Sequence, residues 1–219
     1  MGGSRIYSRD QGTVIMSNQL QKNEYFLGLD LGRKQDHSAL VIVERSLQAM
    51  NTRYIDAYTK WETFLSVRYA KQWKLGTAYG EVAKEVGTIF KKVETLGKSV
   101  LVFDQTGVGD AVFEMIREHL RGSNVEGVVI THDLKRDMYA AVETNLEQGK
   151  LRIPEDCYSS RELKQELLSV EIRRIGFGYK FGAFEKDSHD DLVMALALAC
   201  WRERMSQRSN EPNRRLPGF

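Results

Sequence analysis

The sequence predicts a single α/β domain, from about residue 24 to residue 205, built on a mixed sheet with helices on both faces. Two observations lead to this prediction. Three apolar or β-branched segments follow one another early in the chain with no helical pattern between them, which is typical of antiparallel strands joined by hairpins. Short apolar segments then alternate with stretches of helical periodicity, which indicates parallel strands joined by helices.

The first three predicted strands lie between residues 25 and 63. Residues 25–32, Tyr-Phe-Leu-Gly-Leu-Asp-Leu-Gly, read as a buried strand that ends at Gly32. After a polar turn at 33–37, the apolar residues 38–44 form the second strand, so that the two make a hairpin. Residues 52–63 are aromatic and β-branched, and we expect a third strand there at the sheet edge.

The pattern changes to strand–helix units after residue 77. A helix is predicted from Thr77 to a stop at Gly97, because apolar residues recur at helical spacing. These apolar residues are Val82, Val86, Ile89, Phe90, Val93 and Leu96. The further predicted elements are a strand at 99–103, a helix to about 120, a strand at 125–130, a helix at 134–148, an extended piece at 152–154 and a short helix at 160–168.

The C-terminal part combines an alternating segment with a buried helix. Residues 171–184 alternate with period two, which predicts a half-exposed hairpin with a basic face thinned by glycine. One predicted face carries Ile175, Phe177, Tyr179 and Phe181, and the other carries Arg174, Gly176, Gly178, Lys180 and Gly182. Residues 189–203 are apolar almost all round, so we expect a buried helix.

The ends of the chain and its composition set limits on function. Residues 1–23 and 206–219 are polar and lack periodicity, and we expect a disordered segment or linker and a disordered tail. The net charge is only +2, so a nucleic-acid surface would have to be a local patch. Cys157 and Cys200 lack metal-type spacing and are expected to be reduced, buried thiols. No apolar run reaches about 18 residues, and no membrane span is expected.

Carboxylates end two of the predicted strands and begin the last helix. Asp30 and Asp104 each close an apolar run, and the pair Asp190 and Asp191 opens the buried helix. If the strands are neighbours, these side chains meet at one edge of the sheet, where they repel unless cations neutralise them. Oxygen ligands suit Mg²⁺ or Mn²⁺ rather than zinc, and two such ions can promote phosphodiester cleavage.

Each of these residues also has a structural interpretation. Asp30 could be a turn or capping residue, and Asp190 and Asp191 could be helix N-terminal charges favoured by the dipole. His189 could cap the helix or lie in the core. Asp36 and Asp110 are assigned structural roles in a turn and a first helical turn.

A glycine-rich turn follows Asp104. Gly107 and Gly109 precede a predicted helix and could cradle a phosphate at its N-terminus. The sequence contains no Gly-x-x-x-x-Gly-Lys-Ser/Thr motif, so a P-loop nucleotide site is not supported.

Three motifs resemble the nuclease domain of tailed-bacteriophage terminase large subunits. They are Gly-Leu-Asp-Leu-Gly at 28–32 with Asp-His-Ser-Ala at 36–39, Val-Phe-Asp-Gln-Thr-Gly-Val-Gly at 102–109, and His-Asp-Asp-Leu-Val-Met-Ala-Leu-Ala-Leu-Ala at 189–199. The resemblance covers about residues 24–204. It implies an RNase H-like fold, with antiparallel first strands followed by parallel ones. It also implies that Asp30, Asp104, Asp190 and Asp191 are catalytic ligands of two Mg²⁺ or Mn²⁺ ions, beside a β-hairpin.

The resemblance implies a metal-dependent endonuclease that cuts concatemeric double-stranded DNA during viral genome packaging. The basic residues expected to contact DNA are Arg173, Arg174 and Lys180 on the hairpin, and Lys135 and Arg136 near a helix start. The implied partners are an ATPase motor domain, which this sequence does not contain, a portal and a small terminase subunit. The implied location is the cytoplasm of the infected bacterium.

Three alternatives stay open at the level of sequence. Another RNase H-like nuclease, such as a RuvC-type resolvase or a transposase core, would share the carboxylates. An actin-like or Hsp70-like nucleotide-binding domain also opens with a Gly-x-Asp-x-Gly strand, but it needs a duplicated core and a second glycine-rich hairpin. A non-catalytic DNA-docking module is the third. Incubating supercoiled plasmid with the protein and Mn²⁺, and then with EDTA, separates these alternatives.

Overall fold

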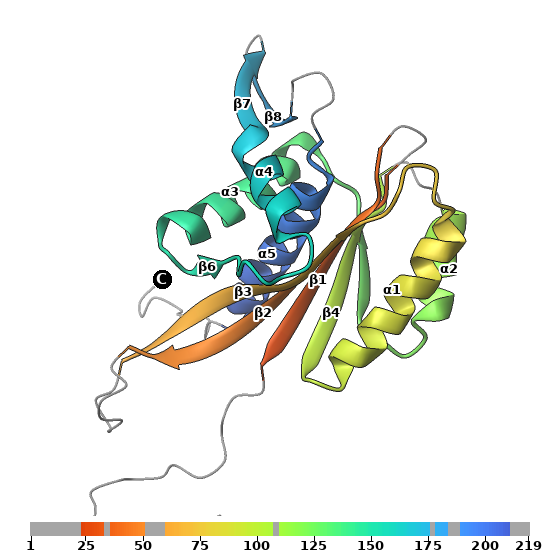
Figure 1. Ribbon diagram of the computed structural model, residues 1–219, viewed down its shortest axis with the longest axis horizontal. Helices are drawn as coiled ribbons and strands as arrows, with labels where there is room; N and C mark the ends of the chain where they lie inside the picture. The colour runs from red at the N-terminus through yellow and green to blue at the C-terminus, as the bar shows by residue number, and fades with distance from the viewer. Residues whose placement is uncertain are drawn as a thin grey trace, which may run out of the picture.

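The computed structural model describes residues 23–32, 36–50, 60–106, 110–175, 178–183 and 189–210, and it contains a six-stranded mixed sheet (Figure 1). The strands are β1 (Glu24–Asp30), β2 (Ala39–Ala49), β3 (Trp61–Gln72), β4 (Lys98–Asp104), β5 (Val125–Val128) and β6 (Leu151–Arg152). Their order is β5-β4-β1-β2-β3-β6. The pairs β1–β2 and β2–β3 are antiparallel, and β4 and β5 continue the sheet parallel to β1, so the predicted mixed sheet is confirmed.

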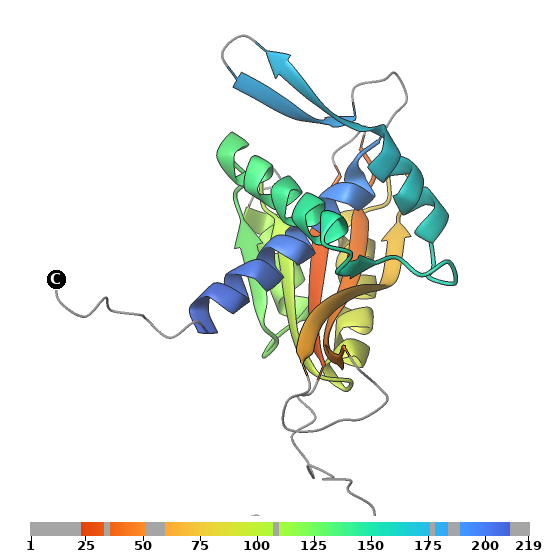
Figure 2. The same ribbon diagram turned by 90° about the vertical axis from the view of Figure 1, so that its left-hand side faces the viewer.

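Helices cover both faces of the sheet, as predicted (Figures 1 and 2). One face carries α1 (Tyr79–Glu94) and α2 (Asp110–His119), and the other carries α3 (His132–Glu147), α4 (Ser160–Ser169) and α5 (Asp191–Asn210). Helix α5 extends past the predicted end at Glu203 into the segment that was expected to be a disordered tail. Among the described residues, no helix combines the length and the apolar character that crossing a membrane requires.

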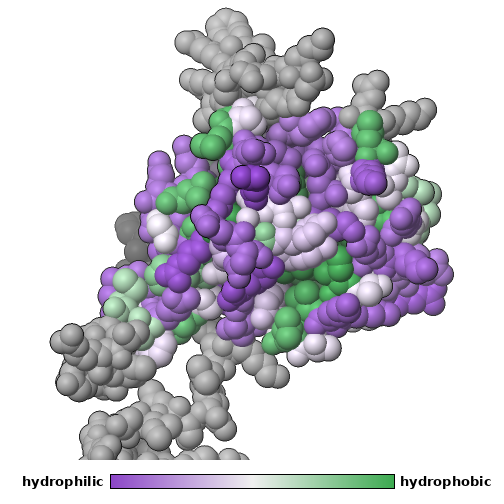
Figure 3. Space-filling view, viewed as in Figure 1, coloured by the Kyte–Doolittle hydropathy of each residue, from purple (hydrophilic) through white to green (hydrophobic). Residues whose placement is uncertain are grey.

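Two hydrophobic clusters, one on each face of the sheet, hold these layers together. Side chains alternate along β1, so Phe26 joins the cluster under α3 and α5, whereas Leu27 and Leu29 join the cluster under α1 and α2. In α5, residues 192–200 are all buried, which confirms the prediction of a helix that is apolar almost all round. Hydrophilic residues cover most of the face in Figure 3, as expected when the apolar side chains lie between layers.

Helix α5 lies directly against β1 at Gly28. A Cβ atom at this position would lie 1.9 Å from the carbonyl oxygen of Ala195 and 2.9 Å from the backbone nitrogen of Ala199. The backbone of the helix therefore touches the backbone of the strand, and only a residue without a side chain permits this approach.

Two sequence predictions about the first half of the chain need correction. The third strand is Trp61–Gln72, so the predicted segment 52–63 overlaps it only at its end, and residues 51–59 lie outside the described part of the chain. The strand is also not at the sheet edge, because β6 pairs with it. Leu96 does not lie on the buried face of α1: the helix ends at Glu94, and Leu96 is exposed.

A separate hairpin, β7 (Val170–Ile175) and β8 (Gly178–Ala183), stands out from the body of the protein beyond α4 (Figures 1 and 2). Its register pairs Arg174 with Tyr179 and Arg173 with Lys180. Residues paired across antiparallel strands share a face. The predicted grouping of Arg174 with Lys180 is therefore wrong, because a simple alternation ignores the turn between the two strands.

Both cysteines are free thiols. Cys200 is buried on α5, as predicted, and burial raises the pKa of its thiol. Cys157 is only partly buried, so the prediction of a buried thiol is wrong at that position.

We predict that Gly28→Ala destabilises the fold by about 3 kcal/mol or more, because a methyl group cannot fit between two backbones that must stay in contact. Urea unfolding measures the change. Gly80→Ala is the matched control, since its added methyl group would meet only the Met115 sulfur at 3.5 Å and helix α1 favours alanine over glycine. Equal stability of Gly28→Ala and wild type would show that α5 does not pack on β1 in this way.

Candidate metal centre at the carboxyl edge of the sheet

Asp30 and Asp104 end neighbouring strands side by side. Strands β1 and β4 are parallel, and their register pairs Leu29 with Phe103. One residue further along, the two aspartates stand next to each other, on strands about 4.8 Å apart. Alternate residues of a strand share a face, so Asp30 lies on the same face as Gly28, which is the face that α5 covers.

The contact at Gly28 also brings Asp191 to this edge. Asp191 lies four residues before Ala195, one helical turn and about 6 Å along α5 on the same side of the helix. Asp30 lies two residues after Gly28, about 6.6 Å along β1. The distance from Ala195 to Asp191 along the helix is thus nearly equal to the distance from Gly28 to Asp30 along the strand. The contact between Gly28 and Ala195 therefore places Asp191 close to Asp30.

The pKa of two of these aspartates, Asp30 and Asp191, is raised. Burial raises the pKa of Asp30 well above its usual value, and the negative charges of Asp191, Asp104 and Asp190 raise it further. The charge of Lys135 acts in the opposite direction. Burial also raises the pKa of Asp191 to about 6. The structure thus brings together all four carboxylates that the sequence singled out.

Asp190 is held by two residues of α3. The Tyr139 hydroxyl donates a hydrogen bond to Asp190 Oδ2 at 2.9 Å, and Lys135 Nζ lies 3.4 Å from the same oxygen. Burial and the charge of Asp190 raise the pKa of the tyrosine. The hairpin also reaches this point, because a Cβ atom on Gly182 would lie 2.9 Å from Asp190 Oδ2. Lys135, predicted to contact DNA, faces a carboxylate in this structure.

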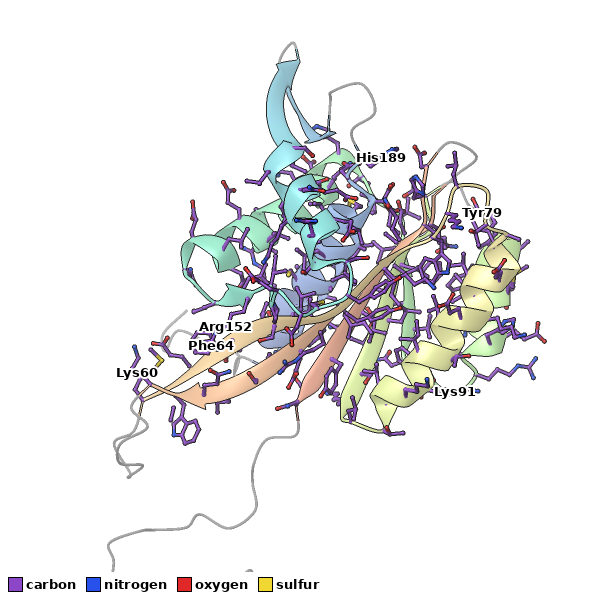
Figure 4. All side chains as sticks on the ribbon, in the orientation of Figure 1. Lys60, Phe64, Tyr79, Lys91, Arg152 and His189 are labelled. Atoms are coloured by element: carbon purple, nitrogen blue, oxygen red, sulfur yellow. The ribbon has the colours of Figure 1, made fainter. Side chains whose placement is uncertain are left out.

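Asp191 has a different set of neighbours. Gln72 Nε2 donates a hydrogen bond to Asp191 Oδ2 at 3.2 Å, and His189 Nδ1 lies 3.8 Å from that oxygen. The His189 ring meets the ring of His37 edge-on at 5.1 Å, and His37 donates from Nδ1 to the Trp73 carbonyl at 2.8 Å. The His189 side chain is 43% exposed, next to the start of α5 rather than in the core (Figure 4).

A fifth acidic residue, Glu166 on α4, joins the site from the side. Burial raises the pKa of its carboxyl to about 8, and the charges of Asp191 and Asp190 contribute, although hydrogen bonds from backbone N–H groups oppose the rise. Its Oε2 accepts the N–H groups of Leu192 at 2.8 Å and Val193 at 3.3 Å. Glu166 is not among the residues predicted from sequence, because a single glutamate in a short helix has no distinguishing pattern.

The position of Glu166 tests whether Asp190 and Asp191 serve only to stabilise the N-terminus of α5. An aspartate before a helix usually accepts the N–H groups of the second and third helical residues. Here those groups, on Leu192 and Val193, are bonded to Glu166, whereas Asp190 accepts from Tyr139. Capping of α5 therefore does not account for the Asp190 side chain.

The structure describes only some of the other residues that were predicted to contact DNA or phosphate. Arg136 is half exposed and lies 3.3 Å from Asp133 and 3.9 Å from Asp137 on its own helix. Arg173 and Lys180 are on the hairpin above the carboxylates, where only the backbone is described. Gly107 and Gly109, the predicted phosphate cradle, lie outside the described residues.

The donor set fits a hard divalent cation. Four carboxylates contribute only oxygen atoms, which Mg²⁺ and Mn²⁺ prefer. In the present side-chain orientations, no three Asp, Glu, His or Cys residues within the described ranges are arranged so that they could hold a metal ion together. Asp190 is turned toward Tyr139, and Asp104 accepts the backbone N–H of Thr106 at 2.7 Å. Ligation of one ion by several of these carboxylates would thus require their side chains to rotate.

Comparison with known proteins finds similarity to terminase large subunits. No protein-family model matches the chain. The chain is 22% identical, over 194 residues, to the terminase large subunit of Thermus phage G20c, and the match covers 88% of this chain and 34% of that protein. The terminase large subunit of Thermus virus P23-45 matches equally well. The chain therefore spans about a third of the length of these relatives.

Solved structures of terminase nucleases share the fold. The large terminase nuclease of phage G20c with bound cobalt has a TM-score of 0.60 at 22% identity, covering 82% of this chain and 81% of that one. The same nuclease with bound magnesium has a TM-score of 0.57 and covers 82% of each chain. The human cytomegalovirus terminase nuclease domain, soaked with manganese, has a TM-score of 0.51 at 12% identity and covers 81% of each chain. The predicted RNase H-like fold and the resemblance to terminases are confirmed.

The raised pKa of Asp191 predicts how stability varies with pH in the absence of metal. Its folded value of about 6 exceeds the usual 3.8, so the native carboxyl holds a proton whose stabilising effect is complete below about pH 4 and is lost as the pH rises through 6. Asp191→Asn cannot lose a proton. Its free energy of unfolding, relative to wild type, should rise by about 3 kcal/mol between pH 4 and pH 7.

Urea unfolding in EDTA at several pH values measures this difference. Asp36→Asn, which removes a carboxyl from an exposed position, is the matched control. A flat profile for Asp191→Asn would mean that Asp191 is not buried among like charges.

Proposed function

We propose that this chain is the metal-dependent endonuclease domain of a viral terminase and that it cuts concatemeric double-stranded DNA by hydrolysing phosphodiester bonds. The observation that carries the proposal is the meeting of Asp30, Asp104, Asp190 and Asp191 at one edge of the sheet. The fold and the sequence similarity to terminase large subunits support it, since related nucleases have been solved with magnesium, cobalt and manganese.

In this proposal the four aspartates hold two Mg²⁺ or Mn²⁺ ions. When bound, such ions supply Lewis acidity and an activated water for attack on a phosphodiester. The protein's own residues orient the ligands: Gln72 holds one oxygen of Asp191, and Tyr139 holds one oxygen of Asp190. Lys135 adds a positive charge beside Asp190 and lowers the repulsion within the cluster.

The DNA path in this proposal runs between the hairpin and the edge of the sheet. The hairpin carries Arg173 and Lys180 as a cross-strand pair, and its strand β8 meets Asp190 at Gly182. Basic side chains there would bind phosphates and bring the scissile bond to the carboxylates. A local patch of this kind suits a protein whose net charge is only +2.

The larger assembly is also part of the proposal. Because the chain matches 34% of its relatives' length, an ATPase motor domain would be supplied by a longer polypeptide or by another protein. A portal and a small terminase subunit would be the further partners, in the cytoplasm of the infected bacterium.

We predict that Asp30→Ala and Asp104→Ala each abolish nicking of supercoiled plasmid in Mn²⁺ without loss of folding. Each change removes a ligand and also relieves repulsion, so the melting temperature without metal should stay equal or rise. The gain in melting temperature on addition of Mn²⁺ should shrink, because stabilisation by a ligand follows its affinity. Asp36→Ala, an exposed aspartate close by, should behave as wild type. Full cleavage by either variant would refute the assignment.

We also predict that DNA binding is tolerant of sequence and strongly dependent on salt, because phosphate contacts release counterions. Replacing Arg173 and Lys180 with alanine in the inactive Asp104→Ala background should flatten the plot of log affinity against log salt by about 2. Titrating a labelled duplex across a salt series measures the slope. Lys91→Ala with Lys92→Ala in the last turn of α1 is the control and should leave the slope unchanged. Equal slopes for all variants would remove the hairpin from the DNA path.

A further inference from the structure

The N-terminus of α5 is capped by a side chain from another helix. Glu166 lies on α4, and its Oε2 accepts the N–H of Leu192 at 2.8 Å and of Val193 at 3.3 Å. These are the second and third residues of α5, whose N–H groups have no partner inside the helix. The carboxyl oxygen of Glu166 that accepts these groups faces the positive end of the helix dipole.

This arrangement leaves the aspartate before the helix available for other contacts. Asp190 occupies the position from which a side chain normally caps a helix. Its Oδ2 instead accepts the Tyr139 hydroxyl and lies near Lys135 Nζ. Because Glu166 satisfies the helix N–H groups, Asp190 can turn toward the centre of the site without leaving buried donors unpaired.

The same glutamate is linked to the second aspartate of the pair. Gln72 Nε2 lies 3.4 Å from Glu166 Oε1 and 3.2 Å from Asp191 Oδ2, so the amide of Gln72 bridges the two carboxylates. One oxygen of Glu166 thus holds the backbone that follows both aspartates, and the other oxygen holds the amide that orients Asp191. Strand β3, helix α4 and helix α5 meet at this point.

We propose that Glu166 is a positioning residue of the metal centre: by accepting hydrogen bonds from the N-terminus of α5 and from Gln72, it sets where Asp190 and Asp191 stand. The inference rests on the proposed metal-dependent nuclease function. Groups that orient metal ligands from behind usually change metal affinity or activity 10- to 100-fold when they are removed. Glu166 acts here as an acceptor of hydrogen bonds and is not itself a ligand.

The test compares Glu166→Ala with Glu166→Gln in plasmid nicking across a Mn²⁺ series, together with calorimetric titration of Mn²⁺ in the absence of DNA. Alanine removes the acceptor, and we expect the Mn²⁺ concentration for half-maximal nicking to rise about 10-fold or more. Glutamine keeps a carbonyl oxygen that can accept both backbone N–H groups, but its NH2 group cannot accept from Gln72, so its midpoint should lie between those of wild type and the alanine variant. The calorimetric affinities should change in parallel.

Glu126→Ala is the matched control for general loosening of α5. Glu126 accepts two hydrogen bonds from Arg202, both at 2.7 Å, on a part of the helix remote from the aspartates. This variant should lower the melting temperature but leave the Mn²⁺ midpoint of nicking unchanged. An equal shift in Glu126→Ala and Glu166→Ala would overturn the inference, since destabilisation alone would then explain it.

The remaining outcomes are also decisive. If Glu166→Gln is as impaired as Glu166→Ala, the hydrogen bonds from the backbone of α5 do not position the aspartates, and the inference fails. If the alanine variant has the wild-type midpoint, or if alanine does not fold and glutamine leaves the midpoint unchanged, the inference fails while the nuclease function stands. If the wild type shows no metal-dependent nicking at all, the proposed function itself fails.

Discussion

The contact between the backbones of β1 and α5 at Gly28 determines the layout of this molecule. Because glycine leaves no side chain between them, the helix lies at the shortest possible distance from the central strand. The helix turn before Ala195 and the two strand residues after Gly28 have almost equal length, so the contact brings Asp191 to Asp30. A bulkier packing layer would separate the carboxylates that the parallel strands and the helix bring to one edge.

Repulsion among the carboxylates of the site lowers the stability of the fold that positions them. Asp30 is partly buried beside three other acidic groups, and its raised pKa reflects the energetic cost of that arrangement. Hydrogen-bond donors from separate elements offset part of the repulsion: Gln72 from β3, and Tyr139 and Lys135 from α3. A buried cluster of like charges that neighbours only partly neutralise is typical of functional sites, because divalent cations can complete the neutralisation.

Much of this arrangement could be predicted from local sequence. A charge at the end of a buried apolar run is conspicuous, which is why Asp30 and Asp104 were found, and the apolar run after Asp191 identified the buried helix. The third strand was misplaced because aromatic and β-branched residues occur on both sides of its true start at Trp61. Glu166 could not be found, since its role arises only when α4 packs against the start of α5.

The central claim is that the carboxylates at this edge form one metal centre. Anomalous diffraction from crystals grown with Mn²⁺ tests it most directly, because it locates the ion without reference to activity. We predict anomalous density in contact with Asp30 and Asp104 and with at least one aspartate of α5. Density remote from these residues, or none at millimolar Mn²⁺, would contradict it.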